Sequence, residues 1–464
     1  MGSPISIGVY TVGCKLNQLE SEAVAQSFRG AGFRVFPWNP GAPPAEGAPD
    51  VLVVNTCTVT SKAEQKARRV IRKALRDHPK SALVVTGCYA QLDPKAIESL
   101  GMGMGIEGET RVFVLAGSRK NALLELPALL AEAGRDGISR VLGQWLGTSM
   151  PDDERFGLQP TDFAFHSRAF LKIQDGCDNR CAYCRVPLAR GPSASLTAAR
   201  ALAALTELEA RGYREAVLAG VNISQYRDGA LDLAGLAARL LQGTSAIGLR
   251  FSSLEPDGVT PALLDTLSHP RVRPHFHLSA QSGSPLVLAR MGRRYTPEVL
   301  GEVAGSLRSV KDDPFLSCDI IAGFPGETPE AFEETLALCL SLDFAHIHGF
   351  PYSRRPGTPA WACAAHEAVP EREARARVER LLALGRQGKR RYIRRWIGKT
   401  VGGIVESLGE PAGFSLVVSD NYLKLRLDRP KGDIPPKGAA ARCRITGFPE
   451  GENAPFDAAA RWEP

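Results

Sequence analysis

The sequence lacks the features that would carry a chain into or across a membrane. No uninterrupted apolar run approaches the roughly 20 residues that a helix needs to span a bilayer. The N-terminus has neither the basic segment nor the apolar segment of a secretion signal. Charge of one sign is not in large excess, because 57 basic residues stand against 50 acidic ones. We therefore expect a cytoplasmic protein without a membrane partner, whose modest positive charge is compatible with a polyanionic partner.

Cysteine is present, but it is not spaced as in a disulfide-rich domain. Ten cysteines are diluted among 464 residues without a secretion signal, and clustered thiols in such a chain more often bind metal or take part in catalysis. Three of them, Cys177, Cys181 and Cys184, lie within eight residues after a strand-like run. No further cysteine or histidine lies nearby to complete a structural zinc site. The spacing predicts a 4Fe–4S cluster with one open iron that binds a substrate or cofactor.

Residues 1–130 alternate short apolar strands with helices. Strand-like segments lie at 5–10, 50–55, 81–86 and 111–116, and residues 62–78 have the apolar spacing of a helix. This alternation predicts a parallel sheet with helices on both faces, where ligands gather at the carboxyl ends of the strands. Three of the strands run into a cysteine: Cys14, Cys57 and Cys88. We expect these thiols to converge and to hold a second 4Fe–4S cluster.

Residues 131–162 have scattered glycine, proline and acidic residues without sustained periodicity, so we interpret them as a linker. From 163 to 395 the alternation resumes, with strands expected at 170–174, 215–220, 248–254, 275–280, 316–321 and 345–350. Six βα units are too few for a closed eight-stranded barrel and predict an open, partial (β/α)6 barrel. The three-cysteine loop follows the first of these strands.

Glycines and polar residues follow the later strands of this partial barrel. Glycine lets the backbone approach a ligand, and the polar side chains can hold ribose hydroxyls and an amine, although each loop alone is ordinary turn chemistry. The candidate cofactor-binding residues are Asn222, Ser253, Glu255, Gln281, Ser282, Gly323, Gly326 and Glu327. No side chain is singled out as catalytic.

Two pairs of histidines alternate along predicted strands, His275 with His277 and His346 with His348. Paired histidines on one strand face can bind metal. Because no third ligand is evident, we interpret them as residues that line or pack the barrel.

The C-terminal segment, residues 396–464, follows a long charged helix at 371–397 that ends in basic residues. Short strands are indicated at 401–407, 414–419 and 421–427, which predicts a small OB-like β-barrel. The basic end of the helix can contact phosphates while its apolar face packs. A second basic face lies on the helix at 62–78, and it is either solvated or guides a polyanion to the nearby cysteines. The fold class is therefore α/β, with an additional C-terminal barrel.

The loop CDNRCAYC at 177–184 resembles the signature of the radical S-adenosylmethionine (SAM) superfamily, in which the open iron binds SAM. CKLNQLES at 14–21 and NTCTVT at 55–60 resemble the tRNA methylthiotransferase family, in the branch that acts on threonylcarbamoyladenosine. The loops at 252–256, 281–284 and 323–328 are also similar to the family's versions. The resemblance covers nearly the whole chain. It implies a methylthiotransferase domain at 1–130, a radical SAM domain at 163–395 and an RNA-binding TRAM domain at 396–464.

This resemblance implies that a methylthio group is added to C2 of N6-threonylcarbamoyladenosine at position 37 of tRNA, next to the anticodon. One SAM would supply the methyl group, and a second would supply the radical that removes hydrogen from C2. The implied partners are the anticodon stem-loop of tRNA, an electron donor such as flavodoxin or ferredoxin, and a sulfur donor. Two alternatives stay open: the same reaction on isopentenyladenosine, and an iron–sulfur RNA-binding sensor without turnover.

The threonyl carboxylate of such a substrate needs a cation, because an unpaired buried charge is costly. An arginine can bind a carboxylate through two parallel hydrogen bonds, whereas an isopentenyl group would need an apolar lining. The candidate arginines in or near the predicted loops are Arg185, Arg190, Arg293, Arg294, Arg354 and Arg355.

Overall fold

The computed structural model describes residues 4–41, 47–102, 111–148, 154–363, 365–407, 414–428, 435–449, 451 and 454–463. Its internal contacts divide the chain into two units. The first contains Met1–Phe165, Asp175–Asn179 and Cys184–Ala194, and the second contains His166–Gln174, Arg180–Tyr183 and Ser195–Pro464. Within the described residues, no helix combines the length and the apolar character needed to cross a membrane.

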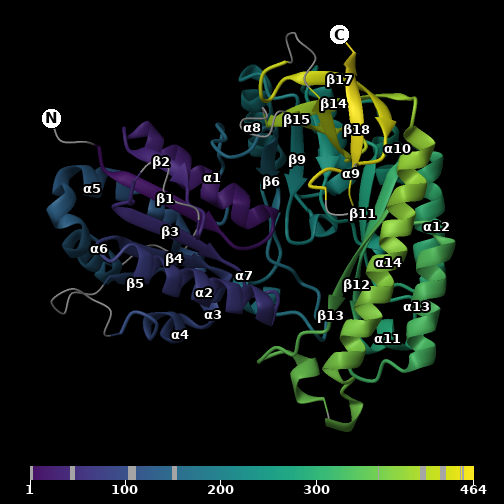
Figure 1. The fold of residues 1–464 in the computed structure, drawn as a ribbon, viewed down its shortest axis with the longest axis horizontal. Coiled ribbons are helices and arrows are strands. Elements are labelled where there is room, and N and C mark those ends of the chain that lie inside the picture. Colours follow the sequence, from purple (N-terminus) through teal and green to yellow (C-terminus); the bar gives the residue numbers. More distant parts are fainter. Residues whose placement is uncertain are drawn as a thin grey trace. The chain divides into compact units, whose positions relative to one another are not determined.

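A five-stranded parallel sheet organises the first unit, in the order β2-β1-β3-β4-β5 (Figure 1). The strands are β1 (Ser6–Thr11), β2 (Arg34–Pro37), β3 (Val51–Thr56), β4 (Ala82–Gly87) and β5 (Val112–Val114). β3 and β4 are buried along their whole length. This is expected of central parallel strands that are covered on both faces.

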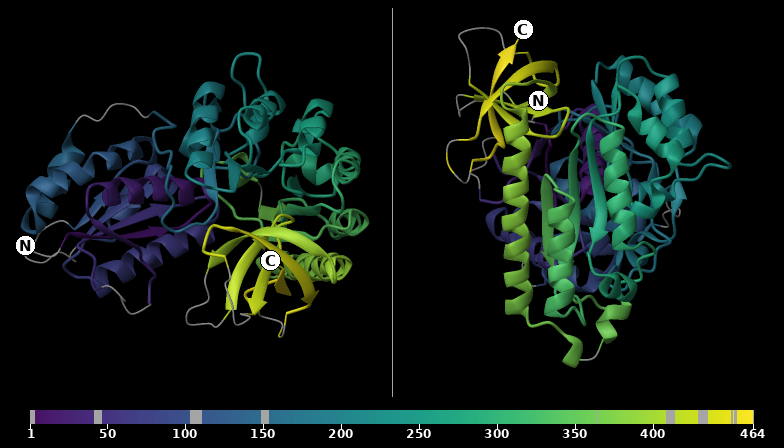
Figure 2. Two further views of the ribbon diagram at one scale, coloured as in Figure 1. Left: turned by 90° about the horizontal axis from the view of Figure 1, so that it is seen from above. Right: turned by 90° about the vertical axis from the view of Figure 1, so that its right-hand side faces the viewer.

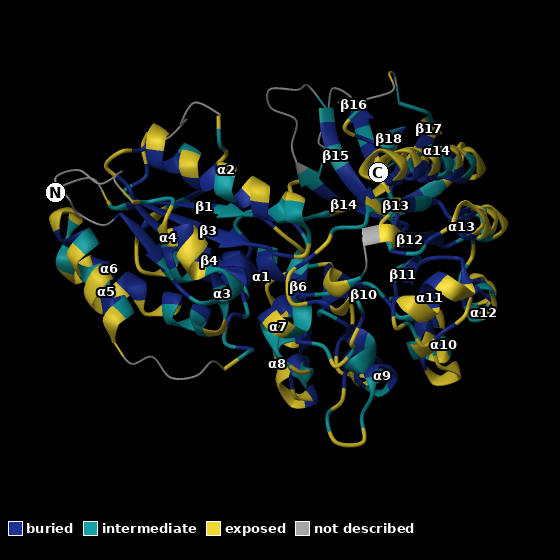
Figure 3. Cartoon of the chain, turned by 90° about the horizontal axis from the view of Figure 1, so that it is seen from below, coloured by how far each residue is buried: buried dark blue, intermediate teal, exposed yellow. Residues whose placement is uncertain are grey.

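Helices on the two faces of this sheet form two separate cores. Alternating side chains of β3 point to opposite faces, Val51 and Val53 into one core and Leu52 and Val54 into the other. The first core receives α1 (Lys15–Gly30), α5 (Leu126–Ala133) and α6 (Ile138–Gly147). The second receives α2 (Ser61–Asp77), α3 (Cys88–Leu92) and α4 (Pro94–Glu98). Two 3-10 helices, η1 (Gly117–Leu124) and η2 (Arg135–Gly137), also belong to this unit, and Figure 3 colours the chain by how far each residue is buried.

Two elements of the first unit differ from the expectation. Residues 138–147 lie in the predicted linker but form α6, whose Leu142 and Trp145 are buried in the core, so this part of the linker prediction is wrong. Glycines at both ends of the segment weaken its helical pattern in the sequence. The edge strand β2 was missed because four residues are too few to show a period. Residues 149–153 of the predicted linker lie outside the described residues.

The second unit contains the predicted partial barrel of six parallel strands. Two three-stranded sheets have the orders β10-β9-β6 and β11-β12-β13, and an isolated parallel bridge between Leu254 and Leu278 connects them. The strands are β6 (Ala169–Lys172), β9 (Glu215–Ala219), β10 (Gly248–Phe251), β11 (His275–Gln281), β12 (Phe315–Ala322) and β13 (His346–Pro351). All six lie where the sequence predicted them, and the predicted fold class is confirmed.

Helices follow these strands along the chain. They are α8 (Ala198–Ala210), α9 (Leu233–Gln242), α10 (Pro261–Ser268), α11 (Pro285–Arg290), α12 (Pro297–Ser309), α13 (Pro329–Ser341) and α14 (Glu371–Trp396). The hydroxyls of Thr197, Thr260 and Thr328 cap α8, α10 and α13 by accepting a backbone N–H of the first turn. The shorter elements are β7 (Gln174–Asp175), α7 (Val186–Arg190), β8 (Ala194–Ser195), η3 (Ile223–Gln225), η4 (Pro256–Gly258), η5 (Pro359–Ala362) and η6 (Ala365–Glu367).

The remaining strands form a closed barrel in the order β14-β15-β16-β18-β17 (Figure 2). They are β14 (Thr400–Ser407), β15 (Phe414–Ser419), β16 (Lys424–Asp428), β17 (Ala440–Gly447) and β18 (Ala458–Glu463). The predicted barrel is confirmed, although the sequence indicated only its first three strands. Its core includes Val417 and Leu425 and extends to Tyr392 and Ile393 of α14. The barrel and the long helix therefore share one core.

A buried ion pair also joins this barrel to the partial barrel. The Arg250 guanidinium donates to both carboxylate oxygens of Glu215 at 2.7 and 2.9 Å, and to the carbonyl oxygen of Ser419 in β15 at 3.3 Å. Both charged side chains are buried. Burial alone would raise the pKa of Glu215, but Arg250, helped by Arg168 and Arg273, lowers it to about 2. Glu215 is therefore ionised at neutral pH and compensates the buried charge of Arg250.

Replacing Glu215 with glutamine is expected to lower the free energy of unfolding by about 3–5 kcal/mol, because the Arg250 guanidinium is then buried without a counter-charge. Urea unfolding followed by tryptophan fluorescence measures this change. Because the pKa of Glu215 falls from 4.5 to about 2 on folding, the pair stabilises the protein above about pH 4.5, and this contribution is lost as the pH falls towards 2. Glu333→Gln is the control, since its pair with Arg380 is exposed and no measurable change is expected. Equal effects of the two substitutions would contradict this role of the buried pair.

Candidate metal centres

Three neighbouring strands of the first unit lead to cysteines at one edge of the sheet. Cys14 precedes α1 just after β1, Cys57 follows the last residue of β3, and Cys88 is the first residue of α3 directly after β4. Because β1, β3 and β4 are parallel neighbours, their carboxyl ends lie side by side. The structure thus brings together the three N-terminal cysteines that the sequence predicted to converge.

Glycines allow the cysteine loops to approach one another. A Cβ on Gly13 would lie only 3.1 Å from the Cβ of Cys57, and a Cβ on Gly87 would overlap the carbonyl oxygen of Thr56. Both glycines have positive φ, +146° and +98°, so a larger residue would also be strained. The glycines that precede Cys14 and Cys88 are therefore required by the spacing of the loops.

Two buried amides tie the first two cysteine loops together. Asn17 Nδ2 donates to Asn55 Oδ1 at 2.9 Å, and Asn55 Nδ2 donates to the Asn17 carbonyl oxygen at 3.0 Å. Asn17 Oδ1 also lies 3.3 Å from Cys14 Sγ. Both asparagines belong to the segments that carried the family resemblance, so these segments have a geometric role around the thiols.

The environment of two of these thiols, Cys14 and Cys57, disfavours negative charge. Burial, and then the neighbouring Cys14 and Cys88, raise the pKa of Cys57 to about 12. Burial also raises the pKa of Cys14, although the guanidinium of Arg190 opposes this rise. Cys14 as a residue is exposed, whereas Cys57 and Cys88 are buried. Three thiolates at this edge therefore require the positive charge of a metal between them.

A buried arginine lies beside this trio in the first unit. Arg190, the last residue of α7, pairs with Glu20 at 2.9 Å and with Asp175 at 3.1 Å. Burial alone would lower the pKa of Arg190, but Asp175, Cys88, Glu20 and Cys14 raise it well above its usual range. A permanently charged guanidinium next to thiols favours their thiolate form, which is the form that binds metal.

The cysteines of the CxxxCxxC loop are divided between the two units. Cys177 and Cys184 belong to the first unit and Cys181 to the second. In the first unit, the backbone N–H of Val186 donates to Cys184 Sγ at 3.4 Å. In the second, Arg293 Nη1 donates to Cys181 Sγ at 3.2 Å. Hydrogen bonds to sulfur stabilise thiolates and raise the reduction potential of a cluster that they hold.

The predicted cofactor-binding residues fall into two groups within the second unit. The first group follows the carboxyl ends of β9 and β10 and ends β11; it contains Asn222, Ser253, Glu255 and Gln281. Gln281 has a φ of +60°, an unusual value for a residue other than glycine. Glu255 forms an ion pair with Arg293, the residue that also contacts Cys181. The first group is thereby linked to a cysteine of the loop.

The second group is held against the helices of the same unit. Its members are Ser282, Gly323, Gly326 and Glu327. The hydroxyl of Ser282 lies 3.1 Å from that of Thr335 in α13. Glu327 accepts a hydrogen bond from Arg377 of α14 at 2.6 Å and one from the backbone N–H of Gly323 at 2.5 Å. These contacts hold the loops in place, and contact of this group with SAM stays a prediction.

Most of the arginines expected to bind a substrate carboxylate have other partners. Arg185, Arg190 and Arg293 form ion pairs with carboxylates of the protein. Arg354 lies over the ring of Trp361, 4.7 Å from its centroid, and Arg355 is buried. Arg294 is exposed and forms no ion pair within the described part of the chain. Sequence reasoning missed these pairings because the partners lie on distant segments.

Two family models match the chain. The radical SAM superfamily matches residues 171–339, and the model described as uncharacterized protein family UPF0004 matches residues 6–104. Among solved structures, the radical SAM methyltransferase TsrM from Kitasatospora setae is similar with a TM-score of 0.50 at 16% identity, over 77% of each chain. At this identity the likeness concerns the fold alone.

Curated relatives match over nearly the whole chain. The threonylcarbamoyladenosine tRNA methylthiotransferase MtaB of Treponema pallidum (strain Nichols) is 40% identical over 95% of this chain and 98% of its own length. The tRNA-2-methylthio-N(6)-dimethylallyladenosine synthase of Cereibacter sphaeroides (strain ATCC 17023) is 30% identical over 94% of this chain and 95% of its own length. With both family models and this extent of identity, the chain belongs to the radical SAM tRNA methylthiotransferase family, in its threonylcarbamoyladenosine branch.

Proposed function

We propose that this protein adds a methylthio group to C2 of N6-threonylcarbamoyladenosine at position 37 of tRNA, next to the anticodon. The observation that carries the proposal is the presence of two separate cysteine trios in one chain, one at the edge of the N-terminal sheet and one in the CxxxCxxC loop. Its support from the comparisons is the 40% identity to a relative that bears the name of this activity.

In this proposal each trio holds a 4Fe–4S cluster. Cys177, Cys181 and Cys184 bind the cluster whose open iron takes SAM, and Cys14, Cys57 and Cys88 bind the second. When bound, these groups supply the reductive cleavage of SAM and the site that carries the sulfur to be transferred. The N-terminal trio fits a cluster, because its donors are all sulfur and the thiols are close enough to shift one another's pKa.

The residues around the trios prepare them for this chemistry. Arg190 keeps a fixed positive charge beside Cys14 and Cys88. Arg293 links Cys181 to Glu255 and so positions the sulfur relative to the loop after β10. We propose Asn222, Ser253, Glu255 and Gln281 as SAM contacts. The other predicted residues would then hold the loops in place through their contacts with the helices; they are Ser282, Gly323, Gly326 and Glu327.

The proposed partners are tRNA, an electron donor such as flavodoxin or ferredoxin, and a sulfur donor, all in the cytoplasm. The target adenine must leave its stack before its C2 can react, which is easier in the single-stranded anticodon loop. Its threonyl carboxylate requires a cation. Among the candidate arginines we propose Arg294 for this contact, because it is exposed and forms no ion pair within the described residues.

The C-terminal barrel offers tRNA a basic outer face. Buried and exposed residues alternate along β17, which turns Arg442 and Arg444 outward beside Arg461 of β18. Arg444 pairs with Glu463 at 2.5 Å, whereas Arg442 and Arg461 form no ion pair within the described residues. At the basic end of α14, Lys389 and Arg395 pair with acidic residues, whereas Arg390 and Arg394 are exposed and form no ion pair within the described residues. We propose that the barrel face contacts the phosphates together with these two arginines of α14.

Anaerobically reconstituted protein is expected to contain about eight irons per chain if both trios hold four-iron clusters. Replacing Cys177, Cys181 and Cys184 with alanine should halve the iron and abolish SAM cleavage. Replacing Cys14, Cys57 and Cys88 should also halve the iron but leave SAM cleavage intact, because the open iron that binds SAM is retained. Iron analysis and chromatography of 5′-deoxyadenosine measure both. Cys363→Ala, outside both trios, should keep all the iron; full iron in the second triple variant would exclude the N-terminal cluster.

Reduced enzyme that is offered two tRNAs, one with threonylcarbamoyladenosine and one with isopentenyladenosine, is expected to turn over the first preferentially. Mass spectrometry of the nucleosides follows the product. Arg294→Ala should lower kcat/KM for the first tRNA by about 10–100-fold, the range of a lost hydrogen bond between charged groups. Its cleavage of SAM without tRNA should not change. Preferential turnover of the isopentenyl tRNA would move the protein to the other branch, and failure to cleave SAM at all would favour a sensor.

The double variant Arg442→Ala/Arg461→Ala is expected to bind tRNA more weakly and to reduce the salt dependence of binding by about two counterions, one for each lost phosphate contact. Filter binding at several salt concentrations measures the slope, and SAM cleavage should stay unchanged. Arg375→Ala is the control, because Arg375 lies at the other end of α14 in an exposed pair with Glu371. An unchanged salt slope in the double variant would remove the barrel face as the RNA contact.

A further inference from the structure

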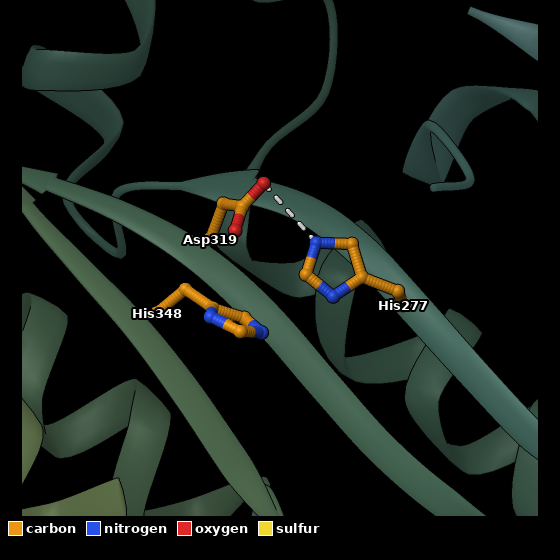
Figure 4. A group of neighbouring side chains, drawn as sticks. All are labelled: His277, Asp319 and His348. Carbon is orange, nitrogen blue, oxygen red and sulfur yellow. Dashed lines mark ion pairs between the residues drawn. The ribbon is translucent and has the colours of Figure 1, made fainter. Parts of the chain in front are cut away.

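Three side chains of the second unit meet on the sheet formed by β11, β12 and β13. They are His277, Asp319 and His348, one from each strand (Figure 4). One ligand atom of each lies within 4.8 Å of the others. The sequence showed the alternating histidines but no third ligand; the structure supplies Asp319.

The register of the strands explains this meeting. β12 pairs with both neighbours in parallel, so that His348 stands opposite Asp319, and His277 stands opposite Ser317, two residues before Asp319. Residues two apart on a strand share a face. The intervening residues point the other way, to the helices: Cys318 contacts Cys339 of α13, and Ile347 lies against Gly385 of α14. The trio therefore occupies the face opposite α13 and α14, on strands that hold it rigidly.

The contacts of His277 orient one ring nitrogen towards Asp319. Its Nδ1 lies 2.9 Å from the hydroxyl oxygen of Ser317, which is buried, and its Nε2 lies 3.1 Å from Asp319 Oδ2. When Nδ1–H donates to the Ser317 hydroxyl, the Nε2 lone pair faces a carboxylate oxygen, and a cation between these two acceptors would satisfy both. A metal-bound imidazole commonly donates its other N–H in this way.

Asp319 is suited to the same role. Its carboxylate lies on the central strand β12, opposite His348 and 3.1 Å from His277 Nε2, so it offers an oxygen ligand close to both imidazoles.

We propose that His277, Asp319 and His348 bind one divalent transition-metal ion, and we take zinc as the ion for the test. Two imidazoles and one carboxylate form a donor set that zinc accepts. Three protein ligands leave a fourth position for water or another oxygen ligand, and the exposure of His348 keeps that side accessible. This centre, with nitrogen and oxygen ligands, is additional to the two sulfur-ligated clusters and does not depend on them.

The test uses full-length protein with its clusters reconstituted, so that the cluster cysteines are occupied by iron. After brief dialysis against EDTA, the protein is given zinc chloride and desalted, and zinc and iron are measured together. We expect one zinc per chain without loss of iron. X-ray absorption at the zinc edge should show only nitrogen and oxygen neighbours at about 2.0–2.2 Å, and none of the sulfur at about 2.3 Å that cysteine would contribute.

Asp319→Asn and His348→Ala are expected to lose the zinc while keeping the iron, which shows that they fold. Ser317→Ala should still bind zinc but about 10–100-fold more weakly, because the orientation of His277 is lost. His346→Ala is the matched control: its ring lies 4.3 Å from that of His348 but outside the trio, and it should bind zinc normally. Wild-type protein that retains no zinc, sulfur neighbours around the zinc, or full zinc in His348→Ala would each overturn the proposal.

Discussion

Three thiols meet at one edge of the N-terminal sheet, in a place where negative charge is costly. Burial and the neighbouring sulfurs raise the pKa of Cys57 to about 12, and burial raises the pKa of Cys14, so these two thiols do not readily lose their protons at neutral pH. Several residues of the first unit allow the three thiols to lie close together. Gly13 and Gly87 let the loops approach one another, and hydrogen bonds between Asn17 and Asn55 join two of the loops. Arg190 adds a buried positive charge. An iron cluster would supply the remaining positive charge.

The second unit also has its candidate loops at the carboxyl ends of strands, and the helices packed against these loops hold them in place. Ser282 and Glu327 are bonded to α13 and α14, so the loop backbones are held by the helix layer before any ligand arrives. The residues at the strand ends, among them Glu255 and Gln281, are therefore held in fixed positions before a ligand binds. Arg293 donates a hydrogen bond to Cys181, so the sulfur of this cysteine is held in place as well. The division between residues bonded to the helices and residues at the strand ends follows from the packing and cannot be recognised in the motifs alone.

Features that depend on local pattern could be predicted from the sequence, and features that depend on distant partners could not. The strands of the five-stranded sheet other than β2, and the six strands of the partial barrel, were predicted because each is a short apolar run between turns. Cys14, Cys57 and Cys88 were singled out because each follows such a run. The edge strand β2 and the helix α6 have weak local patterns and are stabilised by the core that they join. The ion pair of Arg185 with Glu64, and the cluster of Asp319 with His277 and His348, could not be predicted because each joins residues that are far apart in the sequence.

The helix α14 contacts both the loops of the partial barrel and the C-terminal barrel. Near its beginning, Arg377 donates a hydrogen bond to Glu327, and near its end Tyr392 enters the core of the C-terminal barrel and accepts a hydrogen bond from Asn421. The buried pair of Arg250 and Glu215 fixes the same barrel to β9 and β10. The barrel is thus anchored at two independent places to the sheets whose strand ends carry the candidate SAM residues. Any RNA bound on the outer face of the barrel is therefore held by the same rigid unit as those residues, and the barrel cannot be treated as a flexible appendage.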